Sequence, residues 1–112
     1  MPRKFHDPKY ADGDWATGIS SAGSTQATAT TLPSNWNYVE TVSADTTGVV
    51  LKAMTPGEKF GVTNATATSC VLYPPSGAAF NGGTANVGVT VGTRNGVWGI
   101  CITVTKYALF GV

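Results

Sequence analysis

The feature that most constrains the fold of this chain is a series of short alternating runs separated by turn formers. The clearest example is 59–82, where two apolar runs, 60–63 and 68–73, are joined by a small polar link and closed by two prolines, a serine and a glycine. Phe60 and Val62 share one face of the first run. Alternation with a period of two, in runs bounded by turn formers, predicts β-strands. The two runs together predict a β-hairpin.

Similar runs recur from Trp36 to the C-terminus at intervals of about 8 to 12 residues, which is typical of an antiparallel sandwich or barrel. Asn95-Gly96 is a hairpin signal, because both residues accept positive φ. The segment 97–104 is apolar on both faces, which predicts a strand in the middle of a sheet. The nearly uncharged 105–112 predicts a last strand or a subunit contact. The alternating segment 25–32 could be an edge strand.

We therefore expect an all-β fold, an antiparallel β-sandwich that is jelly-roll-like or small and barrel-like. The length of 112 residues suits one domain, and fourteen glycines with six prolines leave little room for long helices. We place the sandwich domain at 32–112 and an extended N-terminal arm at 1–31.

Charge narrows the range of partners. Charged residues make up only 12% of the chain, and the net charge is +1, so we expect neither nucleic acid nor a membrane as a partner. The first residues lack the apolar core of a signal peptide, and no window approaches the roughly 18 apolar residues that span a bilayer, so we expect synthesis in a cytoplasm. A surface this low in charge favours association with copies of itself or with a partner.

The segment 1–31 combines turn formers, charges and large apolar side chains. Phe5, Tyr10, Trp15 and Ile19 recur at intervals of four or five, but prolines and glycines between them oppose a stable helix. We expect an arm that lies in a groove on another chain and orders when it binds. The alternative is a frayed or expression-derived tail.

Residues with catalytic potential are few. The only histidine, His6, lies in the expected arm, and Glu40, Asp45 and Glu58 are the only carboxylates of the expected sandwich domain. Two of these three fall beside turns, so a paired acid and base is not expected, and we predict that the protein is not an enzyme. Asp12-Gly13-Asp14 is interpreted as a solvated turn. We expect no catalytic residue, no metal and no cofactor.

The cysteines and the core aromatic residues have structural interpretations. Cys70 and Cys101 lack a CxxC spacing and are expected as two small buried hydrophobic residues, with a disulfide between them as the alternative. Trp36, Tyr38 and Trp98 lie in patterned strands and are expected to fill the core.

Several segments together resemble a group of small virion proteins of tailed bacteriophages. They are 24–30 (STQATAT), 39–42 (VETV), 47–51 (TGVVL), 56–65 (PGEKFGVTNA) and 71–82 (VLYPPSGAAFNG), and the resemblance covers about residues 24–104. The chain differs from that group in its charged, aromatic start and in its apolar end after Val104. The resemblance implies a capsid decoration (cement) protein that forms a homotrimer, binds the major capsid protein and lies on the exterior of the virion.

From the expected arm and C-terminal run we assign two sets of contact residues. The capsid contacts of the arm are Arg3, Lys4, Phe5, Tyr10, Trp15 and Ile19. The subunit contacts are Tyr107, Leu109 and Phe110. The main alternative is a tail-fibre or baseplate module that binds a host surface glycan or receptor through the loop 76–86 and exposed aromatic residues. A hydrolase acting on cell walls is a third possibility.

Overall fold

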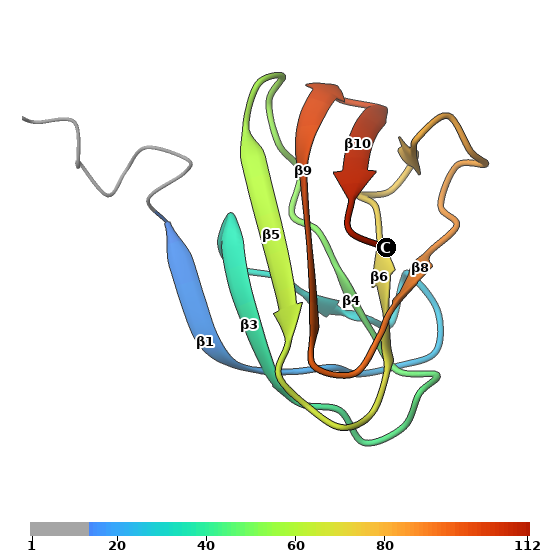
Figure 1. The fold of residues 1–112 in the computed structure, drawn as a ribbon. Coiled ribbons are helices and arrows are strands. Elements are labelled where there is room, and N and C mark those ends of the chain that lie inside the picture. The colour runs from blue at the N-terminus through green and yellow to red at the C-terminus, as the bar shows by residue number, and fades with distance from the viewer. Residues whose placement is uncertain (1–13) are drawn as a thin grey trace, which may run out of the picture.

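The computed structural model describes residues 14–112, which form strands, turns and loops (Figure 1). No helix in this part of the chain is long and apolar enough to cross a membrane. The strands are β1 (Trp15–Ser20), β2 (Thr30–Thr31), β3 (Trp36–Thr41), β4 (Gly48–Val50), β5 (Lys59–Asn64), β6 (Cys70–Tyr73), β7 (Ala79–Phe80), β8 (Val89–Val91), β9 (Asn95–Thr103) and β10 (Lys106–Phe110). The predicted all-β class is confirmed.

The first six strands alternate between two sheets. One sheet has six strands in the order β1-β3-β5-β9-β10-β7, and the other has four in the order β2-β4-β6-β8. β1 pairs with β3, β3 with β5, β2 with β4 and β4 with β6, and all four pairs are parallel. Each odd strand and the even strand after it therefore form one coil, and three coils stack as in a β-solenoid.

The last four strands close the open end of the third coil. β8 pairs antiparallel with β6, and β9 pairs antiparallel with β5. β10 follows as the antiparallel partner of β9, and β7 pairs parallel with β10. Figure 1 shows β1, β3, β5, β9 and β10 side by side, with β4, β6 and β8 in the second layer. Antiparallel pairing between strands is thus found only in this closing part, apart from the isolated bridge between Ala22 and Gly48.

The core lies between the two sheets and is built by the inward face of each strand. In β5 the buried Phe60 and Val62 point inward, as their alternation predicts. Phe60 packs against Tyr107 with ring centroids 6.0 Å apart, and the Tyr107 hydroxyl accepts a hydrogen bond of 3.1 Å from the Met54 backbone N–H. Other fully buried side chains lie in or next to strands of both sheets: Leu32, Val39, Val49, Leu72, Cys70 and Val91.

The hairpin predicted for 59–82 is wrong, because β5 and β6 lie in different sheets. The link between them is a corner organised by the buried Asn64 side chain. Its Nδ2 donates to the Thr68 carbonyl oxygen at 2.8 Å, and its Oδ1 accepts from the Thr66 N–H at 3.0 Å. The buried amide thus satisfies the turned backbone and directs the chain into the second sheet.

The hairpin predicted at Asn95-Gly96 is also wrong. β8 and β9 belong to different sheets, and Arg94 takes the positive φ of 55° at the corner between them. The hairpin of this region joins β9 to β10 instead. Two other expectations are confirmed: β9 lies in the middle of its sheet, and β10 is a last strand within 105–112. Thr30–Thr31 form the edge strand expected within 25–32.

The segment expected as an arm differs from the structure over residues 14–31. β1 pairs with β3 of the same chain, β2 pairs with β4, and Ile19 is only 7% exposed. Pairing and burial of Ile19 stabilise β1 in the body of the molecule, where the sequence pattern indicated only spaced apolar residues. Residues 1–13 of the expected arm lie outside the described residues.

Cys70 and Cys101 are buried and free, as expected. Burial raises the pKa of the Cys70 thiol to about 11. Cys70 therefore remains a protonated, apolar core residue at neutral pH.

Candidate interaction surface

The outer face of the six-stranded sheet carries a row of large aromatic side chains. The strand register places Trp15 beside Trp36, Trp36 beside Gly61, Gly61 beside Trp98, and Trp98 beside Phe110. Because paired residues of neighbouring strands point to the same side, this row crosses five strands of one face. Trp15 is 71% exposed, Trp98 49% and Phe110 48%.

Gly61 makes room within the row. A Cβ atom at this position would collide with the Trp36 ring, so the absence of a side chain lets the indole lie over Gly61. Farther along the row, the rings of Trp98 and Phe110 pack with centroids 4.8 Å apart and planes tilted by 31°. The row therefore has a low centre at Trp36 and Gly61 between the projecting Trp15 and Trp98.

This low centre is an open groove of about 540 Å³. Its lining includes the four aromatic residues Trp15, Trp36, Tyr38 and Trp98, together with small residues of β5 and β9. None of the lining residues is charged. Trp36 Nε1 is buried and has no hydrogen-bond acceptor among the described residues. The groove is thus an apolar depression with aromatic walls.

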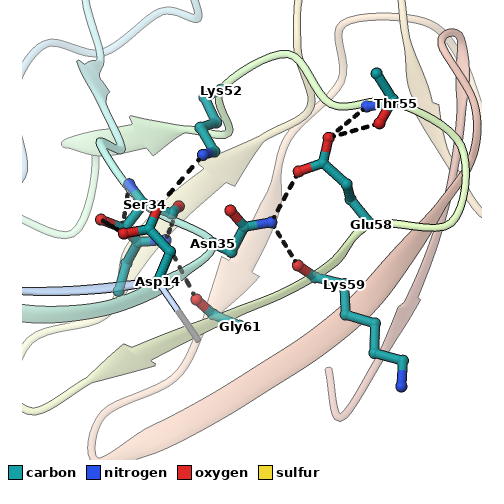
Figure 2. Close-up of polar contacts among 9 residues, drawn as sticks. Asp14, Ser34, Asn35, Lys52, Thr55, Glu58, Lys59 and Gly61 are labelled. Carbon is teal, nitrogen blue, oxygen red and sulfur yellow. Dashed lines mark hydrogen bonds and ion pairs between the residues drawn. The ribbon is translucent and has the colours of Figure 1, made fainter. Parts of the chain in front are cut away.

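Two buried asparagines on either side of Trp36 fix its position. Asn35 Nδ2 donates to the Lys59 carbonyl oxygen at 2.8 Å and to Glu58 Oε1 at 3.1 Å (Figure 2). The Asn35 carbonyl oxygen accepts a hydrogen bond of 2.8 Å from the Gly61 N–H. On the other side, Asn37 Nδ2 donates to the Ser34 carbonyl oxygen at 2.8 Å. Asn37 Nδ2 also donates to the Gly61 carbonyl oxygen at 3.4 Å. Both asparagines thus bind the start of β3 to β5, so the indole between them is held over Gly61.

Glu58 strengthens this attachment of β3 to β5, because its carboxylate accepts several hydrogen bonds. Glu58 Oε2 accepts from the Thr55 N–H and from Thr55 Oγ1, both at 2.8 Å (Figure 2). The Thr55 backbone hydrogen bond is the largest influence on the pKa of Glu58, which is lowered; Asn35, the Thr55 hydroxyl and Lys52 act in the same direction, and burial opposes them. The carboxylate is therefore a charged structural anchor at neutral pH.

A second polar group holds the start of β1. Asp14 Oδ2 lies 3.5 Å from Lys52 Nζ, and Asp14 Oδ1 accepts a hydrogen bond of 3.3 Å from Ser34 Oγ (Figure 2). The Asp14 carbonyl oxygen also accepts from the Trp36 N–H at 2.9 Å. The ion pair is partly exposed and contributes little energy by itself. Together the contacts place Trp15 at the end of the aromatic row.

Two buried titratable groups, Tyr107 and Cys101, lie beneath this face. Burial raises the pKa of Tyr107 to about 12 and also raises the pKa of Cys101. Both groups stay protonated at neutral pH, and the Cys101 thiol donates to the Thr103 carbonyl oxygen at 3.2 Å. Within residues 14–112, no three His, Cys, Asp or Glu side chains are grouped so that they could hold a metal ion. The geometry suits binding through apolar contact.

The structure separates the residues that the sequence suggested as contacts. Arg3, Lys4, Phe5 and Tyr10 lie outside the described residues. Of the others, Ile19, Tyr107 and Leu109 are buried in the core of their own chain, whereas Trp15 and Phe110 are exposed. Trp15 and Phe110 come from opposite ends of the described sequence, and the sheet brings them to one face.

The expectation that Trp36, Tyr38 and Trp98 fill the core is wrong. All three point to the outer face; Tyr38 is 44% exposed and Trp98 49%. In β3 the inward positions go to Asn37 and Val39, because the Asn37 amide finds buried hydrogen-bond partners there. The pattern of 97–104, apolar on both faces, was the sequence signal that Trp98 could belong to an outer apolar face.

No known protein family, curated protein or solved structure was found to match this chain.

Proposed function

We propose that this chain is a structural virion protein that binds the outer surface of a phage capsid as a homotrimer and cements neighbouring subunits of the major capsid protein. The observation that carries the proposal is the aromatic outer face of the six-stranded sheet, which no described residue covers. Apolar area of this extent on a rigid sheet favours contact with another protein surface. The resemblance of residues 24–104 to small phage virion proteins supports the same class.

In this proposal the two sheets act as the two layers of a β-sandwich, with parallel coils in place of the expected antiparallel pairs. Stabilisation of the shell follows from mass action, since a protein that binds only the assembled shell makes the shell harder to open. The segment 1–13 is the part that contacts the capsid. It directly precedes Asp14, whose contacts to Ser34 and Lys52 attach the start of β1 to the body.

The test is deletion of residues 2–13 followed by co-sedimentation with capsids that lack the protein. The deletion ends before β1, which begins at Trp15, so the sheets stay complete. We expect a folded oligomer that no longer binds capsids, while the full chain binds. Undiminished binding would remove the segment from the mechanism. Absence of the full chain from purified heads would contradict the function itself.

A second candidate function is a tail-fibre or baseplate module that binds a host surface glycan. The observation that favours it is the open groove with Trp15, Tyr38 and Trp98 in its walls, because flat aromatic rings can pack against the apolar faces of sugars. Fractionation of particles separates the two functions: head-only particles carry a cement protein and lack a fibre module.

A further inference from the structure

The aromatic outer face has about the apolar area that a subunit contact requires. Trp15, Tyr38, Trp98 and Phe110 are between 44% and 71% exposed. At about 150 to 250 Å² for each full side chain, they present roughly 300 to 500 Å² to solvent. A standard interface buries about 800 Å² on each partner, of which a little over half, about 450 Å², is apolar. The face therefore supplies the apolar part of one ordinary interface.

The same face contains both a projecting and a hollow part. Trp15 and Trp98 project on either side of the groove, whereas Gly61 lies in its floor without a side chain. When two identical chains meet through the same face, that face must supply both the projecting and the hollow parts of the contact. A face with aromatic walls around a hollow meets this requirement.

Charge around the groove is also complementary between copies. The groove itself has no charged lining residue. Glu40 lies two residues beyond Tyr38 on β3, and Lys59 lies two residues before Gly61 on β5, so both point outward from opposite ends of the groove. Each end is mixed in charge, since Arg94 lies near Glu40 and Asp14 lies near the Lys59 end. An antiparallel arrangement of two copies would bring Glu40 of one copy toward Lys59 of the other.

We propose that a second copy of this chain covers the aromatic outer face, so that self-association occurs through the six-stranded sheet with the groove at its centre. The inference rests on the self-association in the proposed function and gives it two-fold symmetry in place of the homotrimer, because a face that meets its own copy closes after two chains. It differs from the subunit contact expected at Tyr107 and Leu109, whose side chains are buried in their own chain.

The experiment compares the solution mass of the full chain with two matched variants. Thr63→Lys places a charge in the groove, and Thr90→Lys places the same charge on the exposed side of β8 in the other sheet. We expect an oligomer for the full chain and for Thr90→Lys, and at least a tenfold weaker association for Thr63→Lys. A monomeric full chain would overturn the proposal, as would equal masses of the two variants.

Quenching of tryptophan fluorescence by acrylamide gives a second measurement on the unaltered chain, which applies even if a variant fails to fold. Trp15 and Trp98 are exposed in the single chain, so we expect weak quenching in concentrated solution and stronger quenching on dilution. Quenching that is equally strong at all concentrations would overturn the proposal. Failure of the proposed function gives a different result: an oligomer with this interface that is absent from purified heads.

Discussion

Phe60 and Phe110 are the same residue type on two faces of one sheet. Phe60 points inward, is fully buried and contacts Tyr107, whereas Phe110 points outward, is 48% exposed and contacts Trp98. The inner face is covered by the second sheet of the same chain, and no described residue covers the outer face. The comparison teaches that apolar character alone does not make a core: the inner face stabilises the fold, and the outer face is available for association.

The largest expected effect distinguishes these two phenylalanines. Phe60→Ala removes a fully buried ring and should lower the free energy of unfolding by about 3 to 5 kcal/mol. Phe110→Ala removes a half-exposed ring and its packing on Trp98, and should cost about 1 kcal/mol in the single chain. Denaturant unfolding at low protein concentration measures both values. Equal losses would show that the two faces contribute alike to folding.

A methyl group at Gly61 tests the centre of the row. Gly61→Ala brings a Cβ into the Trp36 ring, so the indole or the strand must shift, at a cost of about 1 to 3 kcal/mol. Gly92→Ala is the control, because a Cβ there meets its nearest neighbour at an ordinary 3.9 Å. Thermal unfolding and the near-ultraviolet circular dichroism of the tryptophans report the change. An unaltered spectrum and stability for Gly61→Ala would contradict the placement of Trp36.

Two tyrosine-to-phenylalanine substitutions, one on each face of the sheet, compare how much a hydroxyl contributes to stability on the inner and the outer face. Tyr107→Phe leaves the buried Met54 N–H without its acceptor, which should cost about 1 to 3 kcal/mol. Tyr38→Phe removes a hydroxyl from an exposed side chain on the outer face and should change stability by less than about 0.5 kcal/mol. Denaturant unfolding of the pair provides the measurement. A larger loss for Tyr38→Phe would reverse the assignment of the faces.

The smallest effect concerns the anchor beneath the groove. The pKa of Glu58 is lower in the folded chain than its ordinary value of 4.5, so the stabilisation is present above that pH and is lost as the pH falls through the folded pKa. Since Glu58 is partly exposed, Glu58→Gln should cost less than about 1 kcal/mol at neutral pH.

The pH dependence provides the readout for this anchor. Unfolding measured between neutral pH and pH 3 should show the stabilities of the original chain and of Glu58→Gln converging below pH 4.5. Asp45→Asn, which removes an exposed carboxylate from a turn, is the control. A constant difference between the original chain and Glu58→Gln at every pH would show that Glu58 acts through packing and not through its charge.

The sequence predicted strands better than it predicted their partners. Alternation in 60–63 correctly identified Phe60 and Val62 as one face, because the face follows from a period of two. This alternation does not indicate which other strand pairs with the strand that contains Phe60 and Val62. The hairpin expected between β5 and β6 failed because Asn64 turns the chain between sheets through hydrogen bonds to Thr66 and Thr68, which residue spacing does not reveal.

The interaction surface was predicted only in part, for a similar reason. Trp15 and Phe110 were both expected as contact residues, but as parts of an arm and of a C-terminal run with no relation to each other. Their common face depends on the register of five neighbouring strands, β1, β3, β5, β9 and β10. Trp98 was assigned to the core because it lies in a patterned strand, and only the second apolar face of β9 indicated otherwise.

Residue-resolved labelling of side chains by hydroxyl radicals tests the central claim most directly, because it reads both faces of the unaltered protein in one measurement. The account predicts that Trp15, Trp98 and Phe110 become protected as the protein concentration rises, that Phe60 is protected throughout, and that the exposed Val87, away from this face, is labelled throughout. Strong labelling of Trp15 and Trp98 at every concentration would contradict the claim that the outer face serves association.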